Sequence, residues 1–159
     1  MHYLQGQEHE EALQWLQQAA TIALQSTCLR AHCGCIIIAQ GNIIGEGYNA
    51  PPLNKTLNVC FKDSIPKNFK SDRTCCIHAE ERAIIQALKH HAQEIIGARL
   101  YFIRLDEQGN MARAGKPFCT ICSKLALDTG IKEFVLYHDE GICVYETDEY
   151  NTLSYQYKT

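Results

Sequence analysis

The chain has 159 residues, enough for one compact domain, and 21% of them are charged. This balance of apolar and charged residues disfavours a disordered or a fibrous protein. The formal net charge of −3, without a basic stripe, argues against a long nucleic-acid partner, because neutralised phosphates supply most of that affinity, whereas a small anionic ligand needs only one or two cations.

Nine cysteines are many for a chain of this length. Residues 1–8 lack the basic region and the apolar core of a signal peptide, so we expect reduced cysteines and a cytoplasmic location. The apolar runs are too short to span a bilayer, and no membrane partner is expected. We expect one domain over residues 1–159.

The first half of the chain predicts a helix, a hairpin and a long loop. Apolar residues recur at helical spacing from about Glu8 to Leu29, which predicts a helix packed on a sheet. The β-branched runs 33–40 and 42–48 are separated by one short turn signal, which predicts an antiparallel hairpin. Between Leu53 and Thr74 the pattern is lost, and loops of this length are typically lids or ligand-binding segments.

The second half alternates helices and strands around a polar loop, and Gly130 is expected to cap the second of its helices. A tight turn at residues 138–141 would make the last two strands antiparallel, but the direction of the last strand stays open. The tyrosine-rich tail from Tyr145 to Tyr157 is compatible with a helix or with extended chain. The expected helices are 78–91 and 120–129, and the expected strands are 98–105, 133–137 and 142–145.

Two short motifs carry candidate chemistry: His78-Ala79-Glu80 and the pair Cys119 and Cys122. Zinc favours tetrahedral coordination by sulfur and imidazole nitrogen, and a catalytic zinc keeps one of its four positions for water. Cysteines three apart at a helix start lie on nearly the same face, and the free amide groups there favour the ligating thiolate. With His78 as third ligand, Glu80 is a non-ligating carboxylate beside the metal.

The spacing of these motifs limits where they can act. In mid-helix, residues two apart point about 200° apart, so His78 and Glu80 can address one centre only where a helix begins. A His-x-Glu triplet alone is common by chance, and a lone Cys-x-x-Cys is more often a structural metal pair, a redox pair or buried cysteine. Their occurrence together, in this order, predicts a bound zinc.

This combination resembles the cytidine deaminase-like superfamily, whose signature is His-x-Glu followed by Pro-Cys-x-x-Cys. The stretch Gly45–Pro51, the long insertion after it and the stretch Cys76–Glu80 are most similar to the deoxycytidylate deaminase branch. Together with the predicted elements, the resemblance implies a three-layer α/β/α fold with a mixed central sheet of about five strands.

The resemblance also implies roles for individual residues. Zinc would be held by His78, Cys119 and Cys122, and Glu80 would shuttle protons. Asn49 would contact the sugar or the base of the substrate, and the backbone of Ala79 would meet the base.

The implied activity is hydrolytic deamination of a cytosine nucleotide or nucleoside, deoxycytidylate-like, with release of ammonia. The implied partners are a small-molecule substrate and further copies of the chain in a homo-oligomer. One alternative is a deaminase of another base, such as guanine or a modified nucleoside. A second is a non-catalytic, zinc-stabilised nucleotide-binding module, which an intact Glu80 disfavours because a scaffold needs no acid beside the metal.

The sequence departs from the family pattern at three points. Phe118 intervenes between Pro117 and Cys119, and Ala50 replaces the glycine usual after Tyr-Asn in the deoxycytidylate branch. If 142–145 pairs with 133–137 through a tight turn, the last two strands are antiparallel, as in the free-nucleoside deaminases. Motif and topology therefore point to different branches.

The sequence says less about the function of the remaining cysteines and of the basic residues. Cys60, Cys75 and Cys76 are interpreted as ordinary thiols in preference to a second zinc site. Buried small hydrophobes are expected at Cys28, Cys33, Cys35 and Cys143. One or two of the basic residues near the predicted site can bind a phosphate, but these residues can equally belong to the solvated surface of a lid. These residues are Lys62, Lys67, Lys70, Arg73, Arg113 and Lys116.

Overall fold

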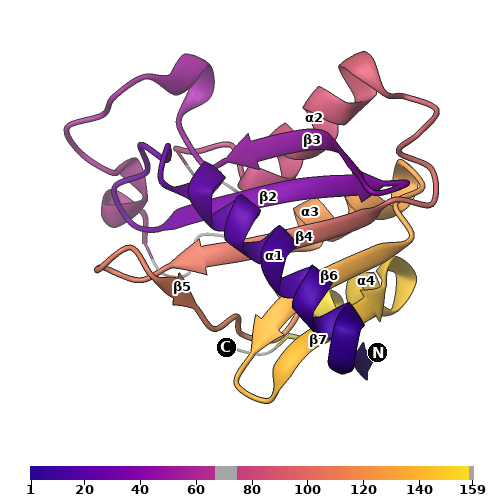
Figure 1. The fold of residues 1–159 in the computed structure, drawn as a ribbon. Helices are drawn as coiled ribbons and strands as arrows, with labels where there is room; N and C mark the ends of the chain where they lie inside the picture. The colour runs from indigo at the N-terminus through magenta and orange to yellow at the C-terminus, as the bar shows by residue number, and fades with distance from the viewer. Residues whose placement is uncertain (67–74, 158–159) are drawn as a thin grey trace.

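A computed structural model describes residues 1–66 and 75–157 and shows three layers, with a mixed sheet between helices (Figure 1). The strand order is β1-β7-β6-β4-β2-β3, and β5 pairs with β4. Only the β4–β6 pair is parallel among the described strands. The strands are β1 (His2–Tyr3), β2 (His32–Ala39), β3 (Asn42–Tyr48), β4 (Arg99–Leu105), β5 (Met111–Ala112), β6 (Glu133–His138) and β7 (Gly141–Glu146).

The expected three-layer α/β/α fold is confirmed, but the expected count of about five strands is wrong. Within the described residues the sheet has seven strands. The two additions, β1 and β5, are two residues long, so they leave no alternating pattern for sequence reasoning to detect. The five longer strands lie within a residue or two of the predicted ranges.

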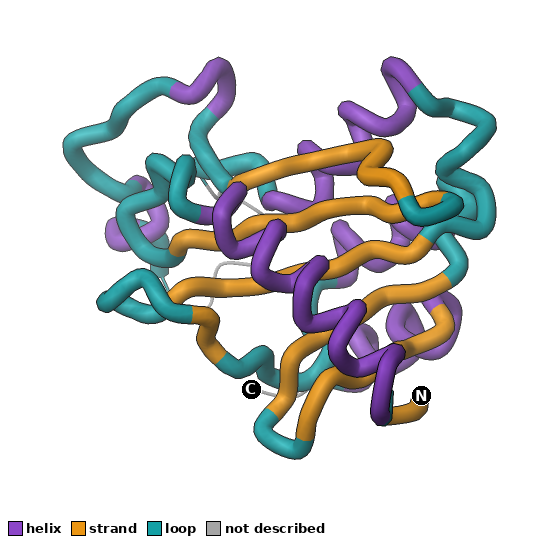
Figure 2. The backbone as a smooth tube through the Cα atoms, in the orientation of Figure 1, coloured by secondary structure: helices purple, strands orange, loops and turns teal. Residues whose placement is uncertain are grey.

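Helix α1 (Gly6–Ala23) crosses one face of the sheet diagonally (Figure 2). Its buried residues pack against alternate residues of the strands, including Ile36 and Ile38 of β2. The helix ends six residues before the predicted Leu29. The physical reason is that Ser26 leaves the helical path and donates a hydrogen bond to the Asn49 carbonyl at 2.6 Å.

The opposite face carries α2 (Ala79–His90), α3 (Thr120–Asp128) and α4 (Thr147–Gln156). Their buried residues share a core with Cys35, Ile37 and Leu100, whose side chains point to that face. The undecided tail is therefore helical from Thr147 to Gln156. Two cores, one on each side of the sheet, hold the layers together.

Residues with positive φ reverse the chain direction between several of these elements. Gln40 and Gly41 both have positive φ, 50° and 75°, which gives the right twist for the β2–β3 hairpin. Gly130, with φ of 82°, ends α3 as predicted, and the Ile131 N–H bonds back to the Ala126 carbonyl at 3.1 Å. The direction of the last long strand, which the sequence left open, is antiparallel: β7 pairs with β6 through a tight turn.

No helix in the part of the chain that the structure describes is both long enough and apolar enough to cross a bilayer.

Candidate metal centre and pocket

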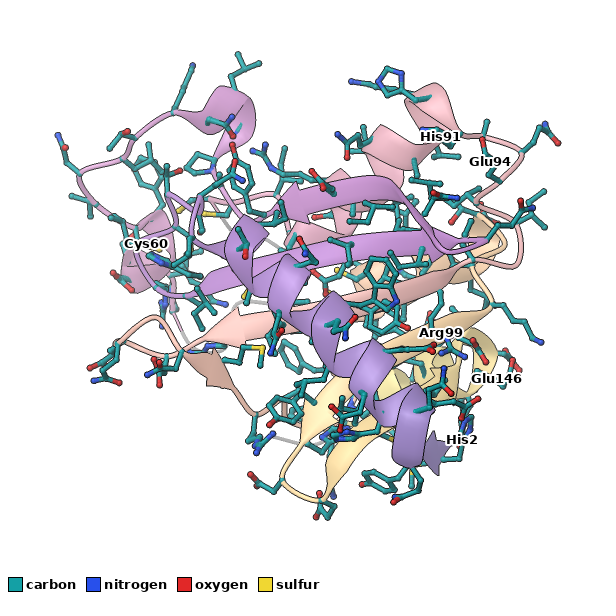
Figure 3. The ribbon with its side chains drawn as sticks, in the orientation of Figure 1. His2, Cys60, His91, Glu94, Arg99 and Glu146 are labelled. Atoms are coloured by element: carbon teal, nitrogen blue, oxygen red, sulfur yellow. The ribbon has the colours of Figure 1, made fainter. Side chains whose placement is uncertain are left out.

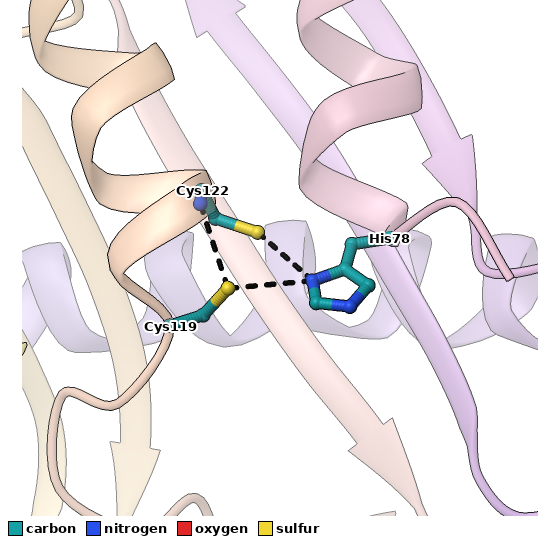
Figure 4. A group of neighbouring side chains, drawn as sticks. All are labelled: His78, Cys119 and Cys122. Carbon is teal, nitrogen blue, oxygen red and sulfur yellow. Dashed lines mark hydrogen bonds between the residues drawn. The ribbon is translucent and has the colours of Figure 1, made fainter. Parts of the chain in front are cut away.

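The three predicted metal ligands meet at the start of two helices. His78 directly precedes α2, Cys119 directly precedes α3, and Cys122 lies in the first turn of α3. The Nδ1 atom of His78 is 3.2 Å from the Cys122 sulfur and 3.4 Å from the Cys119 sulfur (Figure 4). All three donor atoms lie within 4.8 Å of one another. One imidazole nitrogen and two sulfurs at this spacing fit a zinc ion with one position left over.

Local hydrogen bonds hold both helix starts in place. The Glu81 carboxylate accepts a hydrogen bond from the His78 N–H at 2.8 Å, as in a capping box. The Cys119 sulfur accepts one from the Cys122 N–H at 3.5 Å. The start of a helix exposes unpaired N–H groups, which favour a nearby negative charge. Because the starts of α2 and α3 both lie at this cluster, they favour the thiolate form of its cysteines.

The protonation states of the cluster follow from these contacts. Hydrogen bonds from Cys122 and His78 lower the pKa of Cys119 to about 4, despite its burial. The bond to Cys119 raises the pKa of His78 to about 9. The thiolate of Cys119 and the burial of Cys122 together raise the pKa of Cys122. Without metal, the cluster is therefore a thiolate–imidazolium pair beside a protonated thiol.

Glu80 is a buried carboxylate in this pocket. It is only 6% exposed, in the first turn of α2, two residues after His78. Burial raises its pKa to about 7, although the positive charge of His78 acts in the other direction. The Cys122 side chain also acts to lower this pKa, which links the carboxylate to the metal ligands. A group with this pKa can both accept and donate a proton near neutral pH.

A pocket of about 590 Å³ opens in front of the cluster, at the end of the sheet where β4 finishes. Figure 3 shows Cys60, which lines this pocket, at one end of the sheet, and Arg99 at the opposite end. Phe102 and Leu136 of the sheet contribute apolar lining, together with Cys33. The volume is typical of a small-molecule site.

The two residues predicted to contact substrate both line the pocket. The Asn49 amide oxygen accepts hydrogen bonds from Ser26 Oγ at 2.7 Å and from the Cys33 N–H at 2.8 Å. Its nitrogen donates to the Ala31 carbonyl at 2.7 Å, which leaves one N–H for a ligand. Ala79 is the first residue of α2, where the helix leaves its N–H unpaired.

Cations surround the pocket. Of the set considered from the sequence, Lys62, Arg113 and Lys116 line it, whereas Lys67, Lys70 and Arg73 lie outside the described residues. Arg30 and Arg104 also line it and were missed. Arg104 could have been found, because it shares a strand face with Phe102 and Leu100, which lie two and four residues earlier.

Four further cysteines line the same pocket: Cys28, Cys60, Cys75 and Cys76. The Cys60 and Cys75 sulfurs are 3.8 Å apart. Within the described ranges, His78, Cys119 and Cys122 are the one group of three or more candidate ligands at metal-binding spacing, so these cysteines stay interpreted as thiols. Cys35 and Cys143 are buried as expected, but Cys28 and Cys33 are only half-buried because the pocket reaches them.

The fold and the site together define a zinc-binding α/β/α domain with a buried carboxylate next to the metal ligands. The chain belongs to the family described as the cytidine and deoxycytidylate deaminase zinc-binding region, whose sequence profile matches residues 8–138.

Named relatives agree with this assignment. A deoxycytidylate deaminase of Saccharomyces cerevisiae is 29% identical to this chain over 126 residues. The match covers 76% of this chain but only 35% of the length of that relative. A deoxycytidylate deaminase of Mycobacterium phage D29 is 27% identical, over 74% of this chain and 86% of the relative. The structure of a dCMP deaminase from cyanophage S-TIM5, in complex with dCMP and dUMP, superimposes with a TM-score of 0.56 at 23% identity. It covers 82% of each chain, and at this identity the likeness concerns the fold.

Proposed function

We propose that this chain catalyses the zinc-dependent hydrolytic deamination of a cytosine nucleotide, with release of ammonia. The observation that carries the proposal is the Glu80 carboxyl, buried beside the His78, Cys119 and Cys122 cluster at the pocket. A structural metal site needs no such acid, and its burial costs stability. The family and the named relatives support the same reaction class.

Each residue has a role in this proposal. His78, Cys119 and Cys122 hold the zinc, which when bound supplies a water activated near neutral pH. Glu80 would take one proton from the attacking water and pass it to the ring nitrogen. It would then take the second proton from the hydroxyl group added to the ring carbon and pass it to the amino group, which leaves as ammonia while the ring carbonyl forms. The Glu80 pKa of about 7 suits both directions of transfer. The remaining Asn49 N–H and the Ala79 backbone orient the base and its sugar.

Five described cations at the pocket support a nucleotide substrate over a free nucleoside. These are Arg30, Lys62, Arg104, Arg113 and Lys116. A second hollow of about 870 Å³ shares Arg30, Arg104 and Arg113 with the pocket, so a phosphate has cations and room there. The nucleoside is the runner-up, since the antiparallel β6–β7 pairing follows the arrangement implied for nucleoside deaminases.

Ammonia release with zinc quantified tests the reaction, using a panel of bases, nucleosides and nucleotides. Glu80→Gln should keep zinc and lower kcat by a factor of about 10² to 10⁴, because proton transfer is lost while the ligands stay. Glu10→Gln on the exposed side of α1 is the matched control and should match the parent. Deamination by Glu80→Gln at the parental rate would refute the proton shuttle, and an inert parent that binds nucleotides would favour the binding module.

We further propose one domain over residues 1–159 that acts in the cytoplasm as a homo-oligomer. The cysteines of the described residues form no disulfide, which supports a reducing compartment. Exposed apolar side chains on α2 and α3, Ile85, Leu88 and Leu127, support association of copies. Sedimentation equilibrium tests the association, and a monomer at micromolar concentration would contradict it.

A further inference from the structure

Two aromatic side chains lie exposed beside the metal centre. Phe118 is 60% exposed and Tyr157 is 42% exposed, and both line the pocket. Their ring centroids are 4.9 Å apart at 75°, an edge-to-face contact. Single exposed apolar residues are common on protein surfaces. This pair differs because its members pack on each other and line the same pocket as Glu80.

The first ring is fixed relative to the metal ligands. Phe118 stands between Pro117, which is buried and has a restricted φ, and Cys119, the cap of α3. It is also the residue by which this sequence departs from the Pro-Cys-x-x-Cys signature. The departure therefore introduces a large aromatic side chain one residue away from a metal ligand.

The second ring is placed by α4, which lies beyond the family match ending at residue 138. This helix is anchored on α3 by the buried Ser123 hydroxyl, which donates to Asn151 Oδ1 at 2.9 Å and lies 3.0 Å from Ser154 Oγ. Tyr150 stacks on Phe134 with ring centroids 3.9 Å apart. Tyr157, directly after α4, is thereby held against Phe118.

We propose that Phe118 and Tyr157 are substrate-binding residues that form an aromatic wall, against which the heteroaromatic base of the substrate packs. The inference rests on the proposed function and names a part of the site that the zinc motif does not include. Every base has a π face, and packing it on an aromatic ring gains affinity without touching the reacting atoms. The pair should therefore act on substrate binding more than on the chemical step.

Alanine variants of the two residues separate binding from chemistry. Phe118→Ala should raise KM for the best cytosine substrate roughly tenfold, with kcat within about twofold of the parent and zinc content unchanged. Phe118→Trp should have a KM close to that of the parent, because it keeps an aromatic ring at this position. Tyr157→Ala should raise KM less, and the double variant should lose less than the product of the single effects, because the rings support one another. Tyr155→Ala is the control, since this tyrosine is 61% exposed near the end of α4 and does not line the pocket.

Binding of deoxyuridine 5′-monophosphate, measured by calorimetry, tests the wall independently of turnover. Weaker binding by Phe118→Ala, at unchanged zinc content and melting temperature, supports the proposal even if the parent deaminates no cytosine substrate. An unchanged dissociation constant and KM in Phe118→Ala overturn the wall and leave the proposed function standing. A variant that loses zinc or kcat as strongly as affinity also overturns it, because the residue would then be structural. A parent that binds no nucleotide overturns both proposals.

Discussion

At the scale of single residues, the site contains ionisable groups whose charged forms are unfavourable in the folded protein. A glutamate that is only 6% exposed gives up most of its hydration, and the His78 charge beside it does not make up the loss, so its pKa rises to about 7. The cysteines next to it divide one proton unequally, with Cys119 ionised and Cys122 protonated. Both features have measurable thermodynamic consequences.

Glu80→Gln should stabilise the metal-free protein at alkaline pH. Because the folded state raises the pKa of Glu80 from 4.5 to about 7, it holds this proton more tightly than the unfolded chain does. Parental stability therefore falls as pH rises from 4.5 to 7, and the cost stays constant above pH 7 at up to about 3 kcal/mol. Urea unfolding with a chelator present should show the variant more stable at pH 8, with the gain vanishing near pH 4. An equal difference at both pH values would contradict the buried-charge explanation.

Zinc binding to the metal-free protein should release about two protons near pH 7.5. One comes from His78, whose pKa is about 9, and the other from Cys122, whose pKa is raised, whereas Cys119 is already ionised. Apparent zinc affinity should rise with pH, about a hundredfold per unit between pH 7 and 8. Calorimetry in buffers of different ionisation enthalpy counts the protons. Release of none would show that the ligands are already deprotonated.

At the scale of elements, two glycines in β3 let α2 approach the sheet closely enough to present His78 and Glu80. A Cβ atom on Gly47 would lie 2.1 Å from the Ala79 carbonyl oxygen and 2.5 Å from the Ala83 nitrogen. A Cβ on Gly45 would lie 2.4 Å from the Ala83 carbonyl oxygen. These neighbours are backbone atoms of α2, so the helix would have to move away as a unit.

Gly47→Ala should therefore lower both stability and zinc affinity. The overpacked methyl group should cost about 1–3 kcal/mol and should displace the start of α2 from α3. Thermal melting with and without chelator separates the two effects, because a displaced ligand reduces the stabilisation that zinc gives. Gly115→Ala is the control, since no atom lies within 4 Å of its added Cβ. Equal melting temperatures for the two variants would contradict the close approach.

The sequence predicts the elements whose signals are local and repeated. The long strands, the cap at Gly130 and the metal ligands at helix starts all followed from spacing within a few residues. What could not be predicted depends on distant partners: the two-residue strands β1 and β5, the early end of α1 where Ser26 bonds Asn49, and the exposure of Cys28 and Cys33 to the pocket. Arg30 was missed for the same reason, because only the folded chain brings it to the pocket.

At the scale of the whole molecule, one sheet supports two cores, so the layers should unfold together. Trp15, the only tryptophan, is half-buried in the core on the α1 face, opposite the metal site. In the metal-free protein, Trp15 fluorescence and far-UV circular dichroism should give coincident urea transitions. Transitions that separate would contradict the single domain proposed for residues 1–159.

The position of the metal ligands along the chain links the rate of zinc release to the rate at which the fold opens. Cys119 and Cys122 are local neighbours, but His78 lies 41 residues before Cys119, across β4. In an unfolded chain Cys119 and Cys122 can still share a zinc ion, but His78 joins them only after long-range strand pairing. The rate at which a strong chelator removes zinc should therefore approach a limit set by the opening of the fold and become independent of chelator concentration.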